Sequence, residues 1–178
     1  MPSTYTIASS ALIPAPAAVC YDVIADYRTG HPTILPKPWF GPLTVEAGGV
    51  GAGTRIRFEM TVLGKTRVGH AEVTEPVPGH VLMETDEKAG IVTTFTVEHV
   101  GRSASRVTIA TQFSSRVPWL ASAEQAVVGR LLRRIYEKEL ALLDERVGDL
   151  LAHGAGGSGA ATAPLSMGML PGAPSVVS

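Results

Sequence analysis

The sequence predicts an α+β fold in which a large antiparallel sheet packs against one long C-terminal helix. Two patterns support this fold class. Strand-like alternation of apolar and polar residues recurs through residues 4–113. A single apolar stripe at three- and four-residue spacing then follows, formed by Val128, Leu132, Tyr136, Leu140, Leu143, Val147 and Leu151. Because so long a stripe needs a long partner, we expect the sheet to cover it, with an apolar hollow between the two.

The chain starts with one predicted strand and two short helical segments. The strand covers residues 4–13. A helix is expected over residues 16–27, since Pro16 suits a first helical turn, where its missing N–H has no partner to lose. A further helical turn over residues 31–35 ends at Pro36, which cannot continue a helix.

Six more strands are predicted, over residues 43–47, 54–63, 66–75, 81–85, 91–97 and 106–113. Their spacing of about 10 to 15 residues, with turn residues between them, indicates an antiparallel meander rather than βαβ units. The glycine-rich loop at 48–53 is followed by a strand. Because a phosphate-binding loop needs a helix N-terminus after it, we interpret this loop as a hairpin connection with glycines at positive φ.

The remaining chain divides into a helix and a tail. The long helix is expected over about residues 122–152. After it, Gly, Ala, Ser and Pro dominate without periodicity. We therefore expect one domain over residues 1–152 and a flexible tail over residues 153–178.

Composition excludes several classes of function. The net charge is −1, and 17% of residues are charged, so no basic excess indicates nucleic acid or an anionic membrane surface as a partner. No apolar run approaches the roughly 18 residues of a membrane span, and the N-terminus lacks a signal-peptide pattern, so we expect a cytoplasmic protein without membrane insertion. The single cysteine, Cys20, cannot form an internal disulfide.

Five segments carry a family resemblance: 15–26 (APAAVCYDVIAD), 51–60 (GAGTRIRFEM), 71–79 (AEVTEPVPG), 93–97 (TTFTV) and 105–111 (SRVTIAT). The sequences of these segments and their order along the chain resemble the START-like superfamily, also called the SRPBCC, helix-grip or Bet v 1-like fold, over roughly residues 4–150. Within it, the chain is similar to the polyketide cyclase/dehydrase and lipid-transport group. The resemblance implies a curved antiparallel sheet of six to seven strands, two short helices and a C-terminal helix over an apolar cavity.

Members of this superfamily bind lipids, hormones or polyketides, and only some of them catalyse a reaction. The resemblance implies that this chain binds an apolar small molecule, lipid or polyketide-like, without a cofactor and as a monomer or homodimer. Apolar walls with few polar anchors are typical of such pockets. The residues predicted to line the cavity are Phe58, Met60, Met83, Phe95, Phe113, Leu132 and Tyr136.

The alternative is a cofactor-independent aromatase/cyclase or dehydratase acting on a polyketide-like substrate, which needs an acid/base group in the cavity. The candidates are His70, His31, Tyr136 and Glu59. His31 follows the first helix, near where this fold opens its cavity. His70 faces inward if Val68 does, and outward if Ala71 and Val73 face inward.

The charged residues favour plainer interpretations. Glu59 and Glu84 lie on strands between apolar neighbours, and Glu59 shares its face with two arginines, which favours a surface charge pair. On the long helix, Glu137 and Glu139 partly offset a basic run that we interpret as a solvated face. The five histidines lack metal-ligand spacing, and no cysteine pair supports a metal site, so none is expected.

A third hypothesis is a structural or partner-binding role. Trp39, Phe40 and Trp119 are the large aromatic residues that would mark such a surface. Exposed together, they would form the kind of contiguous apolar patch that marks interfaces.

Overall fold

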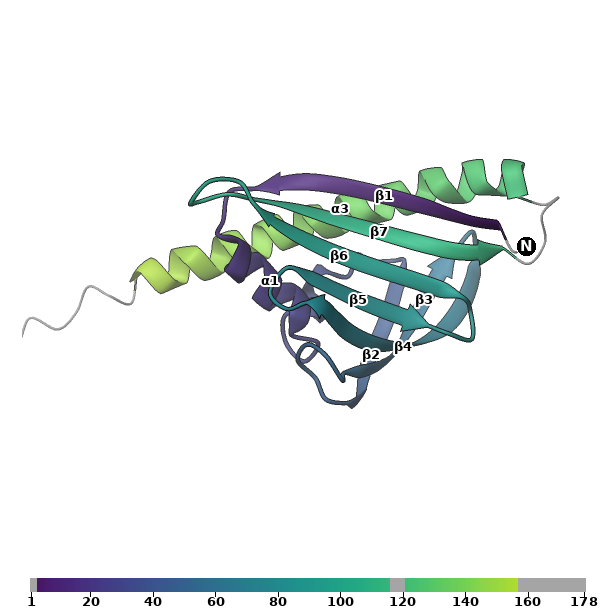
Figure 1. Cartoon of the computed structure of the whole chain (residues 1–178), viewed down its shortest axis with the longest axis horizontal. Coiled ribbons are helices and arrows are strands. Elements are labelled where there is room, and N and C mark those ends of the chain that lie inside the picture. The colour runs from purple at the N-terminus through teal and green to yellow at the C-terminus, as the bar shows by residue number, and fades with distance from the viewer. Residues whose placement is uncertain (1–2, 116–120, 157–178) are drawn as a thin grey trace, which may run out of the picture.

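The computed structural model describes residues 3–115 and 121–156, and in it a curved antiparallel sheet grips one long helix (Figure 1). The strands are β1 (Ser3–Ile13), β2 (Phe40–Ala47), β3 (Arg55–Val62), β4 (Lys65–Val77), β5 (Val81–Asp86), β6 (Ile91–His99) and β7 (Ser105–Ser115). The helices are α1 (Ala17–Ala25), α2 (His31–Ile34) and α3 (Ala121–Gly156). The predicted α+β helix-grip fold, with two short helices after the first strand, is therefore confirmed.

The sheet has seven strands in the order β1-β7-β6-β5-β4-β3-β2. Every neighbouring pair is antiparallel, and the first strand pairs with the last, for example Ile7 with Thr111. The register shifts within the β2–β3 pair and within the β4–β5 pair. Such bulges bend a strand and increase its twist, so they help curl this half of the sheet around the helix.

Helix α3 lies against the concave side of the sheet, behind β1 and β7 in Figure 1. Gly129 brings the helix close to β1, because a Cβ atom placed there would lie 3.6 Å from Cδ1 of Ile7. The stripe residues Leu132, Tyr136, Leu140, Leu143 and Val147 are buried, as the periodicity predicts. Leu151 is 39% exposed, because the last turns of α3 extend beyond the sheet.

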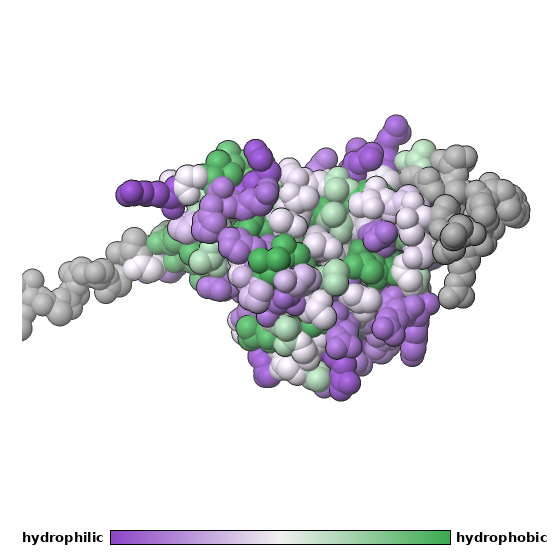
Figure 2. All heavy atoms as spheres, in the orientation of Figure 1, coloured by the Kyte–Doolittle hydropathy of each residue, from purple (hydrophilic) through white to green (hydrophobic). Residues whose placement is uncertain are grey.

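The other face of the sheet points away from α3. Figure 2 shows apolar residues on it only as separate small patches among polar ones. One face packed and one face solvated is the usual arrangement of an antiparallel sheet. The buried core therefore lies entirely between the sheet and the helices.

The glycine-rich loop joins β2 to β3, and no helix follows it. Gly48 and Gly51 have φ angles of 68° and 59°, a region that glycine adopts at low cost. The loop packs on the end of α1, where Tyr27 N–H donates to the Gly49 carbonyl (2.9 Å) and Gly51 N–H donates to that of Ala25 (3.0 Å). The interpretation as a hairpin connection is confirmed.

Two boundaries differ from the predictions or fall outside the structure. Helix α3 continues to Gly156 rather than ending at 152, since a glycine in an exposed last turn costs only about 1 kcal/mol. The rest of the predicted tail, residues 157–178, and Trp119 lie outside the described residues. None of the described helices is both long enough and apolar enough to cross a membrane.

Candidate functional site: a cavity between sheet and helix

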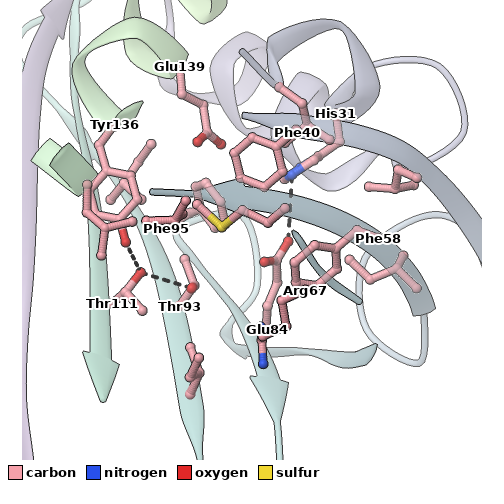
Figure 3. Close-up of a pocket in the computed structure, with 18 of the residues that line it drawn as sticks. His31, Phe40, Phe58, Arg67, Glu84, Thr93, Phe95, Thr111, Tyr136 and Glu139 are labelled. Atoms are coloured by element: carbon pink, nitrogen blue, oxygen red, sulfur yellow. Dashed lines mark hydrogen bonds and ion pairs between the residues drawn. The ribbon is translucent and has the colours of Figure 1, made fainter. Parts of the chain in front are cut away.

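A cavity of about 320 Å³ lies between the concave face of the sheet and α3 (Figure 3). Its wall is mostly apolar, with a few polar side chains. The lining residues are His31, Leu35, Phe40, Leu43, Ile56, Phe58, Met60, Val62, Lys65, Arg67, Glu84, Ile91, Thr93, Phe95, Ile109, Thr111, Phe113, Val128, Leu132, Tyr136 and Glu139. A large apolar pocket with a few convergent polar groups is the usual form of a small-molecule site.

The structure places six of the seven predicted lining residues on this wall, namely Phe58, Met60, Phe95, Phe113, Leu132 and Tyr136. Met83 is a correction, because it does not line the cavity. Its neighbour Glu84 does, and successive side chains of a strand point to opposite faces. Met83 therefore points to the outer face of β5.

Two of the four acid/base candidates, His70 and Glu59, also lie on the outer face. His70 pairs in register with Arg57 and places its Nδ1 3.5 Å from a carboxylate oxygen of Glu46. Glu59 lies 3.6 Å from the Arg57 guanidinium. His70 is exposed and Glu59 is partly exposed on this outer face, so neither can act on a ligand in the cavity. The strand register decides this, since Ala71 and not His70 faces the core.

His31 points into the cavity from α2, with only 2% of its surface exposed. Its Nδ1 lies 2.7 Å from the Ile24 carbonyl oxygen, which can only accept, so Nδ1 carries the proton. Its Nε2 is thereby directed to Glu84, whose carboxylate lies 3.6 Å away. The ring stacks on Tyr27 and meets Phe95 edge-on, with centroids 4.5 and 5.5 Å apart.

Tyr27, which follows α1, fixes this corner of the cavity. Its hydroxyl donates to the Glu84 carboxylate at 2.6 Å. Burial, and then the charge of Glu84, raise the pKa of Tyr27 well above its usual value, so the phenol keeps its proton and remains a donor. Tyr27 therefore links the helical segment to β5.

Tyr136 of α3 supplies the hydroxyl on the opposite wall. It donates to the Thr111 hydroxyl, which lies 3.0 Å from that of Thr93 (Figure 3). Burial raises the pKa of Tyr136 well above its usual range. The fourth candidate thus lies in the cavity beside further polar groups.

Glu139 is the most unusual group in the cavity. Its side chain is 3% exposed, and its carboxyl points into the space between Tyr136 and His31 (Figure 3). Among the residues that the structure describes, none donates to it or forms an ion pair with it. Burial, and then the charge of Glu84, raise the pKa of Glu139 well above its usual value, which favours the protonated acid.

The prediction from the sequence placed Glu139 wrongly on the solvated face of the long helix, and it did not include Glu84 among the residues that line the cavity. A usable signal exists for both. Glu139 lies three residues after Tyr136 and four before Leu143, so it falls within the apolar stripe. Glu84 lies two residues after Leu82 and shares its inward face.

The cavity has an open end and a closed end. Lys65 and Arg67 approach it from β4, near the β3–β4 turn, where Lys65 is exposed and Arg67 is held by Asp86 at 3.1 Å. His31 and Glu139, by contrast, are almost fully buried, with 2% and 3% of their surfaces exposed. By exposure, we therefore distinguish an open end at Lys65 from a closed end formed by His31, Glu84 and Glu139. The expectation that His31 lies near the opening of the cavity is wrong, because its side chain is almost fully buried.

This fold and cavity agree with a family match that covers most of the chain. Residues 4–148 match the model of the family described as polyketide cyclase/dehydrase and lipid transport. The chain belongs to this family. Family membership supports a role in binding a small hydrophobic ligand or in cyclisation. No curated protein matches the chain significantly.

Solved structures of similar fold include members of several functional groups. KanY protein, solved by NMR, is 28% identical over 82% of this chain and 99% of its own, with a TM-score of 0.72. A protein from Thermus thermophilus is 22% identical over 82% and 99% of the two chains, with a TM-score of 0.66. The ZhuI aromatase/cyclase from Streptomyces sp. R1128 is 14% identical over 82% and 94%, with a TM-score of 0.63, which shows a shared fold alone.

Proposed function

We propose that this family member binds a mostly apolar small molecule inside the cavity between the sheet and α3. The cavity itself supports this most directly: about 320 Å³ of space is walled mainly by apolar side chains, with His31, Glu84 and Glu139 at its closed end. A ligand seated there buries its apolar body against the walls and places a polar group near His31, Glu84 and Glu139. Hydrophobic burial drives such binding at roughly 25 cal/mol per Å² of apolar surface.

Native mass spectrometry of the freshly purified full chain tests this proposal. We expect a co-purified or added apolar molecule at one per chain, and denaturing extraction identifies a co-purified one. The neutral apolar dye Nile red provides the matching solution test, with saturable fluorescence enhancement at one site. A chain that carries no ligand and also fails to bind Nile red would contradict the proposal.

A second candidate function is a cofactor-independent cyclase or dehydratase. One observation favours it: His31 and Tyr136 share the cavity with Glu84 and with Glu139, whose pKa is raised by burial and by the charge of Glu84. Acid and base groups kept in different protonation states in one cavity are what proton transfer requires. The reaction class would be proton abstraction next to a carbonyl group.

Deuterium exchange tests the second candidate without a known substrate. Methyl octyl ketone in deuterated water should exchange protons next to its carbonyl faster with the protein than in buffer. His31→Ala and Tyr136→Phe should each slow this exchange by about a hundredfold, the usual contribution of an acid/base group. A rate equal to that of buffer, from a folded protein that binds the ketone, leaves binding alone as the function.

A further inference from the structure

We infer that Glu139 sets the ligand specificity of the cavity: its closed end takes an uncharged carbonyl oxygen and excludes a carboxylate. This inference rests on the proposed binding function and narrows its ligand class. The ligand would be an apolar chain or ring system that ends in a ketone or ester, and not a free fatty acid.

The position of the Glu139 carboxyl leaves it available to a ligand in the cavity. The residue is only 3% exposed, its carboxyl points into the cavity, and none of the described residues forms a hydrogen bond with it. A ligand in the cavity can therefore form a hydrogen bond with this carboxyl without displacing a protein partner. The raised pKa of Glu139 favours the protonated acid, whose O–H donates to an acceptor, and a carbonyl oxygen is an acceptor without a charge.

The charged groups around Glu139 disfavour a ligand carboxylate. The ionisable side chains that line the cavity around it are Tyr136 of α3, His31 of α2, Glu84 of β5, and Lys65 and Arg67 of β4, with Tyr27 behind Glu84. Arg67 is engaged by Asp86, and Lys65 lies at the open end. A ligand carboxylate near Glu139 would therefore meet the carboxyl groups of Glu84 and Glu139, while the Arg67 guanidinium is already paired with Asp86.

A cationic head group is the competing occupant, since two carboxyl groups face this space. The observations favour the neutral ligand. Glu84 already accepts from Tyr27 and faces His31, so its charge is partly compensated. An ammonium group would also lose its hydration inside mainly apolar walls, which is costly for a charge.

Three probes built on ten-carbon chains test the inference: methyl decanoate, decanoic acid and decylamine, titrated calorimetrically into the full chain at neutral pH. We expect the ester to bind at least about tenfold more tightly than the acid or the amine, a difference of about 1.4 kcal/mol. Glu139→Gln should keep this preference, because an amide still donates. Glu139→Leu should lose it. The control Glu137→Gln changes an exposed residue of the same helix and should behave like the wild type.

The pH dependence gives a second readout. Donation requires the protonated acid, so ester affinity should be highest below the raised pKa of Glu139 and should fall as the pH increases through it. In Glu139→Gln this fall should disappear. A parallel fall in both proteins would assign it to another group in the cavity and overturn the role of Glu139.

Other outcomes separate this inference from the proposed function. Decanoic acid that binds as tightly as the ester overturns the inference and leaves ligand binding intact. Decylamine that binds most tightly, with binding lost in Glu139→Gln, replaces it with a cation site. Failure of all three probes and of Nile red overturns both proposals.

Discussion

Replacing Val128 with tryptophan should lower the affinity of the protein for Nile red by about ten- to hundredfold. Val128 lines the cavity from α3 and is half-buried, so a larger side chain there enters the cavity rather than the close-packed core. A ligand would have to displace the indole, and forcing extra volume into a packed site costs about 1–3 kcal/mol. A fluorescence titration of the purified variant measures the effect.

The neighbouring residue provides a matched control. Val127 is 56% exposed and is not among the residues that line this cavity, so Val127→Trp adds the same side chain outside it. We expect Val127→Trp to bind Nile red within about threefold of the wild type, a difference below 1 kcal/mol. Equal losses in both variants would mean that the dye binds outside the cavity.

The largest effect on stability is expected at Tyr27. Tyr27→Ala should lower the free energy of unfolding by about 3–5 kcal/mol, the usual cost of removing a large buried aromatic side chain. Tyr27 is 1% exposed, stacks on His31 and donates to Glu84. Urea denaturation with an unchanged m-value measures this loss as a true change in stability.

Tyr27→Phe separates packing from hydrogen bonding. The ring stays in place while the hydroxyl is lost, so the Glu84 carboxylate loses its 2.6 Å donor. We expect a cost of about 1–3 kcal/mol, as for other buried groups left without a partner. If Tyr27→Ala costs less than Tyr27→Phe, the ring does not hold this corner of the cavity as described.

The fold could be predicted from the sequence because its signals are local and repeated. Alternation in the strand at 54–63 and the three- and four-residue stripe in the long helix each follow from one backbone geometry. The glycines at 48–53 predict a turn without any knowledge of the tertiary structure. Glycine adopts a positive φ at low cost, and this depends on the single residue. The end of α3 was less predictable, because one glycine in an exposed turn has only a small effect.

The site could be predicted only in part. Phe58 and Met60 alternate with polar residues, so their inward direction follows from the strand pattern. Met83 and Glu84 are neighbours in a short strand. With so few residues, the sequence pattern does not decide which of the two side chains faces the cavity. His70 required the register of β4 against β3, a property of two strands and not of one.

The sequence by itself determined that a sheet and a helix enclose an apolar space, because periodicity decides which face of each element is buried. Only the tertiary structure decided what that space can bind. His31, Glu84 and Glu139 come from segments far apart in the chain, and their proximity depends on how α2, β5 and α3 pack. The raised pKa of Glu139 depends in turn on that packing, since burial and the charge of Glu84 arise only in the folded chain.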